Sequence, residues 1–293
     1  MRSFEQYHPA VLAAYFFSVI LVAMFCDHPV LLTEALAGAG LFCAVLERGR
    51  NVGSNLAFYI PLFLMTALLN PLFSHNGVTP LFFLNGNPVT LEAILYGAAI
   101  AGMLIAVLLW CKCYTYIMTG DKFLYLFGRA VPKLGLVLSM ALRFVPRLRM
   151  QIKQVSKAQK AMGLYASKSY LDKLRSGLRV FSAVVTWSME NAIDTGDSMR
   201  ARGYGLKGRG HFSLFHFTQR DGGLLGCTVL LLGAVLTGIL LKGGVFYYYP
   251  KITEITAGPL SLLLYGAFGL LSLLPFLIEV KEYIKWKYFV SKI

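Results

Sequence analysis

Ser198-Met199-Arg200-Ala201-Arg202-Gly203-Tyr204-Gly205 lies near the end of a hundred-residue basic stretch that separates two groups of long apolar segments. Residues 121–220 hold 18 of the 28 Lys and Arg residues but only five of the 14 Asp and Glu residues. Basic residues between membrane spans are expected on the cytoplasmic side. The sequence therefore predicts a membrane protein with a large cytoplasmic helical insert, and we expect this insert to bind a soluble partner.

The composition is that of a membrane protein, with 57% hydrophobic and 14% charged residues. A helix needs about 20 apolar residues to cross a hydrocarbon core of about 30 Å. Six segments approach or exceed this length: 9–26, 29–46, 55–71, 91–113, 222–242 and 256–280. The first three are short, so we expect one or two irregular spans. The first segment has no small-residue cleavage site and leads directly into the second, which argues against a cleaved signal peptide.

These segments predict an all-α fold, a polytopic membrane helix bundle of about six spans with a large cytoplasmic coupling region between spans four and five. The expected divisions are N-terminal spans in 1–118, coupling helices in 119–220, and C-terminal spans with a tail in 221–293. Cytoplasmic N- and C-termini put nearly all basic clusters on one side. The outer loop, residues 71–90, then contains no Asp, Glu, Lys or Arg. We therefore expect a multi-pass protein of the cell membrane, in contact with lipid.

Several functional classes are disfavoured by the residues present. The net charge of +14 does not require nucleic acid, because cytoplasmic Lys and Arg also follow from orientation and from anionic lipid. The five Cys residues form no Cys-x-x-Cys pair and the His residues are scattered, so neither a metal site nor a disulfide is predicted. The chain has no G-x-x-x-x-G-K-[ST] loop for ATP. We expect neither an enzyme nor a bound cofactor.

The insert is predicted to break into helical pieces at Pro132 and Pro146. The apolar segment 133–145 is too short to cross a bilayer, so we expect it in the membrane interface, with Arg143 extending to the headgroups. A second helix with an apolar stripe should run from Pro146 to a stop at Gly163.

A further apolar stripe extends from Leu174 to Ile193 and predicts a helix that stops at Gly203 and Gly205. Glycine ends a helix in a conformation that other residues resist. Ala201 would let a partner surface come close, and Arg202 carries a planar fork of donors suited to a carboxylate. Arg202 is equally suited to the last carbonyls of its own helix, and both interpretations stay open.

Four motifs make the chain similar to the transmembrane T component of energy-coupling factor (ECF) transporters, prokaryotic importers of vitamins and of metal ions such as cobalt or nickel. The resemblance covers most of the chain, and the motifs keep the order expected of the family. They are Asn70-Pro71-Leu72-Phe73, Met118-Thr119-Gly120-Asp121-Lys122, Met140-Ala141-Leu142-Arg143-Phe144-Val145-Pro146 and Asp197-Ser198-Met199-Arg200-Ala201-Arg202-Gly203.

The resemblance implies a scaffold that connects two cytoplasmic ATPases to a small substrate-capturing membrane subunit. Two coupling helices would each end in Ala-Arg-Gly and dock into a groove on one ATPase, and ATP binding would move both helices and reorient the capture subunit. The first signature departs from the family at Met162, where arginine is expected. Either the charge of Lys160 or an apolar contact would replace it. The implied ATPase-binding residues are Lys160, Ala161, Met162, Gly163, Arg200, Ala201, Arg202 and Gly203.

Two other functions remain open. An ion-coupled secondary carrier or channel would use Glu34, a carboxylate about a third of the way into the second span, since such groups often mark ion paths. It would leave the basic insert unexplained, and the chain shows no convincing internal repeat. The other alternative is a membrane scaffold without a transport function.

Overall fold

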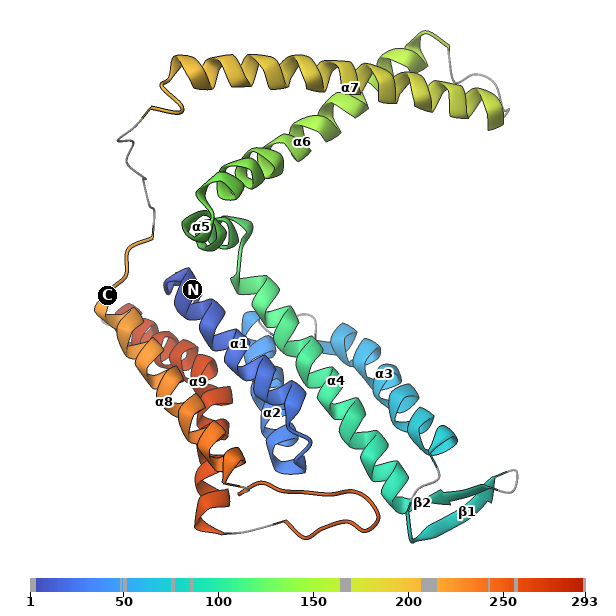
Figure 1. Ribbon diagram of the computed structural model, residues 1–293, viewed down its shortest axis with the longest axis vertical. Coiled ribbons are helices and arrows are strands. Elements are labelled where there is room, and N and C mark those ends of the chain that lie inside the picture. Colours follow the sequence, from blue (N-terminus) through green and yellow to red (C-terminus); the bar gives the residue numbers. More distant parts are fainter. Residues whose placement is uncertain are drawn as a thin grey trace. The chain divides into compact units, whose positions relative to one another are not determined.

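The structure is a computed structural model that describes residues 4–47, 49, 52–74, 77–84, 87–163, 170–206, 215–241, 243–255 and 258–291. The described residues belong to two compact units (Figure 1). The membrane unit comprises Met1–Phe123 and Phe215–Ile293, and the insert unit comprises Leu124–Leu214. The assignment of residues 119–220 as a coupling region concerns function and stays a prediction.

Each of the six predicted spans corresponds to a helix in the membrane unit. These helices are α1 (Pro9–Phe25), α2 (Pro29–Leu46), α3 (Val52–Phe73), α4 (Leu91–Ile117), α8 (Gln219–Leu240) and α9 (Pro259–Val290), preceded by a short 3-10 helix at Phe4–Gln6. Within the described residues, five helices are long and apolar enough to cross a membrane, and α1 is a shorter apolar helix. The predicted all-α membrane bundle is confirmed, with α1 as the short element.

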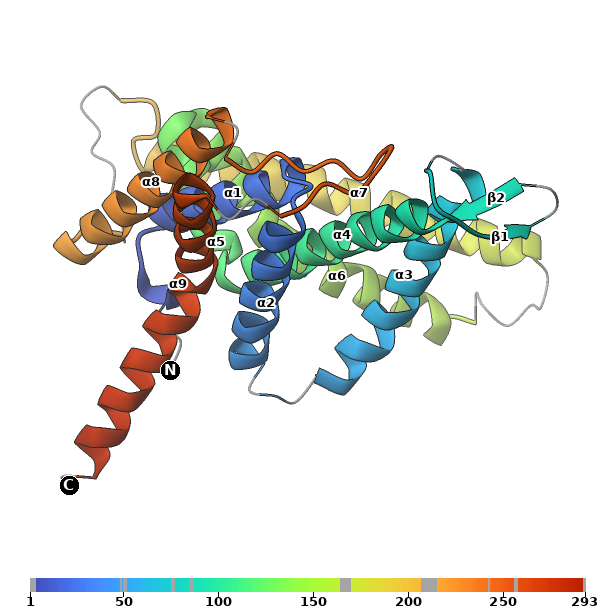
Figure 2. The same cartoon turned by 90° about the horizontal axis from the view of Figure 1, so that it is seen from below.

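Helix α2 lies at the centre of the membrane unit and packs against α1, α4 and α9. Helix α3 packs on α4, and α8 packs on α9 and α1 (Figure 2). The approach of α2 to α9 depends on Gly38, because a Cβ there would lie 2.8 Å from both Cβ and the carbonyl oxygen of Ser272. Small residues permit such close helix packing in membranes.

The core of the membrane unit is rich in aromatic side chains. Among the described residues, six of them are at most 1% exposed: Phe4, Tyr15, Phe16, Phe42, Trp110 and Phe268. Their polar atoms are satisfied by backbone, since Trp110 Nε1 donates to the Ala35 carbonyl at 3.1 Å and the Tyr15 hydroxyl donates to the Leu271 carbonyl at 2.9 Å. These bonds connect α1, α2, α4 and α9 through a core with no unsatisfied ring donor at these positions.

The segment after α3 differs from the loop predicted for residues 71–90. Helix α3 continues to Phe73, and β1 (Pro80–Leu84) pairs antiparallel with β2 (Asn87–Thr90). The aromatic and β-branched residues here favour strands. Thr90 caps the start of α4, because its Oγ1 accepts a hydrogen bond from the Ala93 backbone N–H at 3.3 Å.

Three helices form or enter the insert: α5 (Gly120–Ala130), α6 (Pro132–Ala161) and α7 (Tyr170–Ala201). The predicted helix break at Pro146 is wrong, because α6 continues through it. A proline removes one backbone hydrogen bond, but α6 packs on α7 on both sides of this position. Before it, Phe144 stacks on Trp187 with ring centroids 5.7 Å apart. After it, Ile152 lines a groove with residues of α7.

Candidate functional site

Both predicted coupling helices end where the sequence indicated. We define the first tip as residues 160–163, at the end of α6, and the second tip as residues 200–203, at the end of α7. Gly163 has φ +77° and Gly203 has φ +79°, a left-handed conformation that residues with a Cβ disfavour. The predicted helix stops at these two glycines are therefore confirmed.

At the second tip backbone N–H groups satisfy three of the last four carbonyls of α7, those of Ser198, Met199 and Arg200. Tyr204 N–H donates to the Met199 carbonyl at 3.0 Å, and Gly203 N–H donates to the Arg200 carbonyl at 2.9 Å. These two bonds form a Schellman motif. Arg202 N–H donates to the Ser198 carbonyl at 3.2 Å. Because these carbonyls already have donors, the helix end does not need the Arg202 side chain as a cap.

At the first tip the backbone bonds of Met162 and Gly163 match those of Arg202 and Gly203. Gly163 N–H donates to the Lys160 carbonyl at 3.0 Å, and Met162 N–H donates to the Ala158 carbonyl at 3.1 Å. Met162 is therefore the counterpart of Arg202, directly before the left-handed glycine. Its side chain is 69% exposed, which gives the first tip an apolar surface where the second tip carries a cation.

The two tips do not form one site. They lie at opposite ends of α7 (Figure 1), and a 32-residue helix is about 48 Å long. Lys160, Ala161 and Ala201 are exposed, and Gly203 is half-buried. Arg200 is exposed and lies 3.9 Å from Asp197. The structure therefore places the predicted site residues in two separate groups, each open to solvent.

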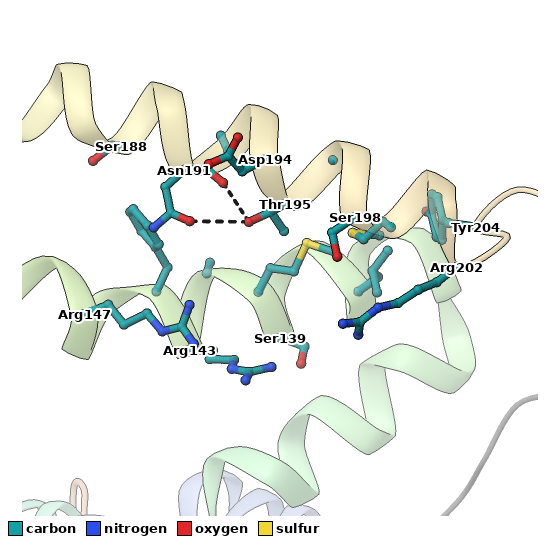
Figure 3. A pocket seen from close by; sticks show the side chains of 17 residues that line it. Ser139, Arg143, Arg147, Ser188, Asn191, Asp194, Thr195, Ser198, Arg202 and Tyr204 are labelled. Atoms are coloured by element: carbon teal, nitrogen blue, oxygen red, sulfur yellow. Dashed lines mark hydrogen bonds between the residues drawn. The ribbon is translucent and has the colours of Figure 1, made fainter.

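The Arg202 side chain borders a pocket of about 880 Å³ between α6 and α7. Figure 3 shows it extending from the end of α7 into the space between the helices, toward Ser139. Arg143 and Arg147 line the same pocket from α6. Sequence analysis assigned Arg143 to the membrane interface and missed Arg147. Had α6 been taken as continuous, the i, i+4 spacing of these two residues would have placed them on one helix face.

The predicted apolar stripe of α7 is largely exposed to solvent. Five of its side chains are 58–67% exposed: Leu174, Leu178, Phe181, Met189 and Ile193. Leu171, one turn before the stripe, is 72% exposed. On the opposite side, Val180 and Val184 are buried at the α6–α7 contact. A contiguous apolar surface of this kind marks a site for a protein or a membrane.

Lys122, within the predicted motif at residues 118–122, lies in the first turn of α5 and belongs to the membrane unit. The Lys122 side chain is 6% exposed, and its ammonium donates to the Ile117 carbonyl at 3.1 Å and to the Glu5 carbonyl. Burial lowers the pKa of this amine. The first turn of α5 is thus held to α4 and to the N-terminal segment by a buried lysine.

Glu34, the residue of the carrier hypothesis, lies on α2 next to α9. A Cβ at Gly269 would be 3.4 Å from its carboxyl group. Its Oε2 is buried and has no hydrogen-bond partner within the described residues. The structure therefore places one isolated carboxyl group there, and no chain of ionisable groups accompanies it in the described part of α2.

The fold defines a class, that of multi-pass membrane proteins with a long helical insert between spans. Residues 1–212 match the family model CbiQ, described as "Cobalt transport protein". The chain belongs to this family.

Curated relatives include the "Energy-coupling factor transporter transmembrane protein EcfT" of Listeria innocua, 35% identical over 113 residues, which are 38% of this chain and 40% of the relative. The protein of the same name from Exiguobacterium sibiricum is 32% identical over 114 residues, 38% of this chain and 42% of the relative. The matched part thus spans about two fifths of these relatives.

Proposed function

We propose that this chain is the transmembrane coupling component of an ATP-driven ECF-type importer of a vitamin or metal ion. Two cytoplasmic ATPases bind the two tips, and a small membrane subunit captures the substrate. The chain itself catalyses no reaction, and its termini lie in the cytoplasm. Family membership and the names of the relatives support this proposal, as do the two exposed tips of the insert.

The observation that carries the proposal is the backbone cap at the second tip. Because the carbonyls of Ser198, Met199 and Arg200 already accept backbone hydrogen bonds, the Arg202 guanidinium is available for another molecule. Within the described residues it makes no ion pair. An arginine at an exposed helix end beside Ala201 suits a carboxylate in a groove of a partner protein.

The insert is built to transmit movement. Helices α6 and α7 have 30 and 32 residues and pack on each other, so a force at one tip displaces a long element instead of a loop. ATP-driven closure of the two ATPases would move both tips, and the exposed stripe of α7 would pass this movement to the capture subunit. Selection of the substrate then belongs to the capture subunit.

The direct test replaces Arg202 by glutamate and measures co-purification of the ATPases and uptake. Losing one partner of a buried charge pair costs about 2–5 kcal/mol, so Arg202→Glu should release the ATPase and abolish uptake while the chain stays inserted. Arg179→Glu is the matched control, because Arg179 is an exposed arginine of α7 away from both tips. Unchanged capture of both ATPases by Arg202→Glu would contradict the proposal.

The same preparations separate the two alternatives. Uptake that persists after ATP depletion but collapses with the proton gradient would indicate a carrier that uses Glu34, and Glu34→Gln should then abolish it. A wild-type chain that captures no ATPase and supports no uptake would indicate a scaffold.

A further inference from the structure

We propose that Arg143 and Arg147 of α6 form, together with Arg202, one anion-binding pocket that receives acidic side chains of the ATPase docked at the second tip. This inference rests on the proposed function. It adds Arg143 and Arg147, which lie outside both tips, to the docking site of the ATPase. It also predicts that the pocket is positively charged and that the docked protein carries acidic side chains opposite it.

The geometry brings three guanidinium groups to one cavity. Arg143 and Arg147 are four residues apart and line the pocket from α6, and Arg202 enters it from the end of α7 (Figure 3). Phe144 lines this cavity and stacks on Trp187, which joins the two helices beside it. The three arginines therefore line one pocket although they are 59 positions apart in the sequence, from Arg143 to Arg202.

The charge of the pocket is not balanced from within. Among the described residues that line it, Asp194 alone is acidic, so the three arginines leave a net charge of about +2. Within the residues that the structure describes, none of the three guanidinium groups makes an ion pair. Asp197, the acidic residue of α7 that precedes Arg202 most closely in the sequence, lies 3.9 Å from Arg200. An incoming anion would therefore meet donors that are not already engaged.

The lining indicates which kind of anion fits. Apolar side chains of Leu136, Met140 and Met199 share the pocket with the hydroxyls of Ser139 and Ser198. Arg143, Arg147 and Arg202 are exposed, so a protein that covers the pocket would exclude water and thereby strengthen a charge-assisted hydrogen bond. The forked guanidinium matches a carboxylate with two bonds. Since Arg202 belongs both to the second tip and to the pocket wall, a protein that docks at the tip covers the pocket. Acidic side chains of that protein are the occupants that this charge selects.

The experiment measures binding of the purified ATPases that the wild-type chain captures, identified by mass spectrometry as proteins with a P-loop. The full chain is placed in phosphatidylcholine nanodiscs, and Kd is measured between about 0.05 and 0.5 M salt. We expect Arg143→Gln/Arg147→Gln to weaken binding about tenfold or more and to reduce its salt dependence. Lys153→Gln/Lys157→Gln removes the same charge from α6 outside the pocket and should leave Kd within about twofold of wild type.

Two further measurements distinguish a loss of anion binding from a disturbed helix crossing. Arg143→Lys/Arg147→Lys should recover part of the affinity, because it keeps the charge and loses the fork. The fluorescence of Trp187, in a background without the other two tryptophans, should be the same in all variants if the helix crossing is intact. Equal loss in the Lys and Gln variants with a shifted Trp187 emission would overturn the pocket and assign the effect to helix packing.

The remaining outcomes are also decisive. Wild-type affinity and salt dependence in the Gln variant would overturn the pocket while the proposed function stands. Failure of the wild-type chain to bind any ATPase would overturn both. An effect of the Gln substitutions that appears only in nanodiscs containing phosphatidylglycerol would show that the pocket binds lipid headgroups and would overturn the assignment to a protein partner.

Discussion

Lys112 on α4 closes a buried polar network that connects three helices of the membrane unit. Its ammonium lies 2.6 Å from Glu47 Oε1 and donates to Asn55 Oδ1 at 2.6 Å, while Asn55 Nδ2 donates to Glu47 Oε2 at 2.7 Å. Replacing Lys112 by methionine leaves two acceptors without this donor, one on a carboxylate whose side chain is 2% exposed. Each unsatisfied buried group costs about 1–3 kcal/mol, so we expect Lys112→Met to lower the free energy of unfolding by about 2–4 kcal/mol.

The assay is denaturant unfolding in mild detergent, followed by the fluorescence of Trp110, which is fully buried in the same unit. Lys285→Met is the control, because Lys285 is exposed on α9 and should change stability by less than about 0.5 kcal/mol. The double variant Lys112→Met/Glu47→Gln should recover part of the loss, since the carboxylate is then neutral. A Lys112→Met protein as stable as the control would refute the reasoning.

Three further predictions concern helix packing, the second tip and pH. Gly38→Ala should destabilise the α2–α9 contact by about 1–3 kcal/mol because its Cβ meets backbone, whereas Gly40→Ala enters open space and should be neutral or slightly stabilising; thermal unfolding separates them. Gly203→Ala strains a residue at φ +79°, costs about 1–2 kcal/mol, and should weaken ATPase capture in a pull-down without changing insertion. Burial lowers the pKa of His28 below 6.5. Protonation of His28 therefore favours the unfolded chain, and the free energy of unfolding should fall as the pH drops below about 6.5. His28→Gln should reduce this pH dependence when unfolding is measured at about pH 7.5 and 5.5. Equal stability of wild type at both pH values would contradict the last prediction.

The spans and the two helix ends were accessible from the sequence because their causes are local. An apolar run long enough for a bilayer must form a helix, since lipid offers no partner for exposed backbone groups. A glycine that follows an amphipathic stripe supplies the left-handed residue that a helix end requires, as Gly163 and Gly203 do. The equivalence of Met162 and Arg202 could likewise be predicted, because both precede such a glycine.

Other features depend on contacts between distant parts of the chain. Propensity favours a helix end before Pro146, yet packing of α6 on α7 stabilises one continuous helix across it. That continuity puts Arg143 and Arg147 on one face beside Arg202, an arrangement that no local pattern contains. The Lys112–Glu47–Asn55 network has the same origin, because α4, α3 and the end of α2 must meet before all of its bonds can form.

The sequence alone determined which segments are helices and where two of them stop, since those are properties of neighbouring residues. Which charged side chains share a pocket or a bond was decided only by tertiary packing, because it brings together residues that are far apart along the chain.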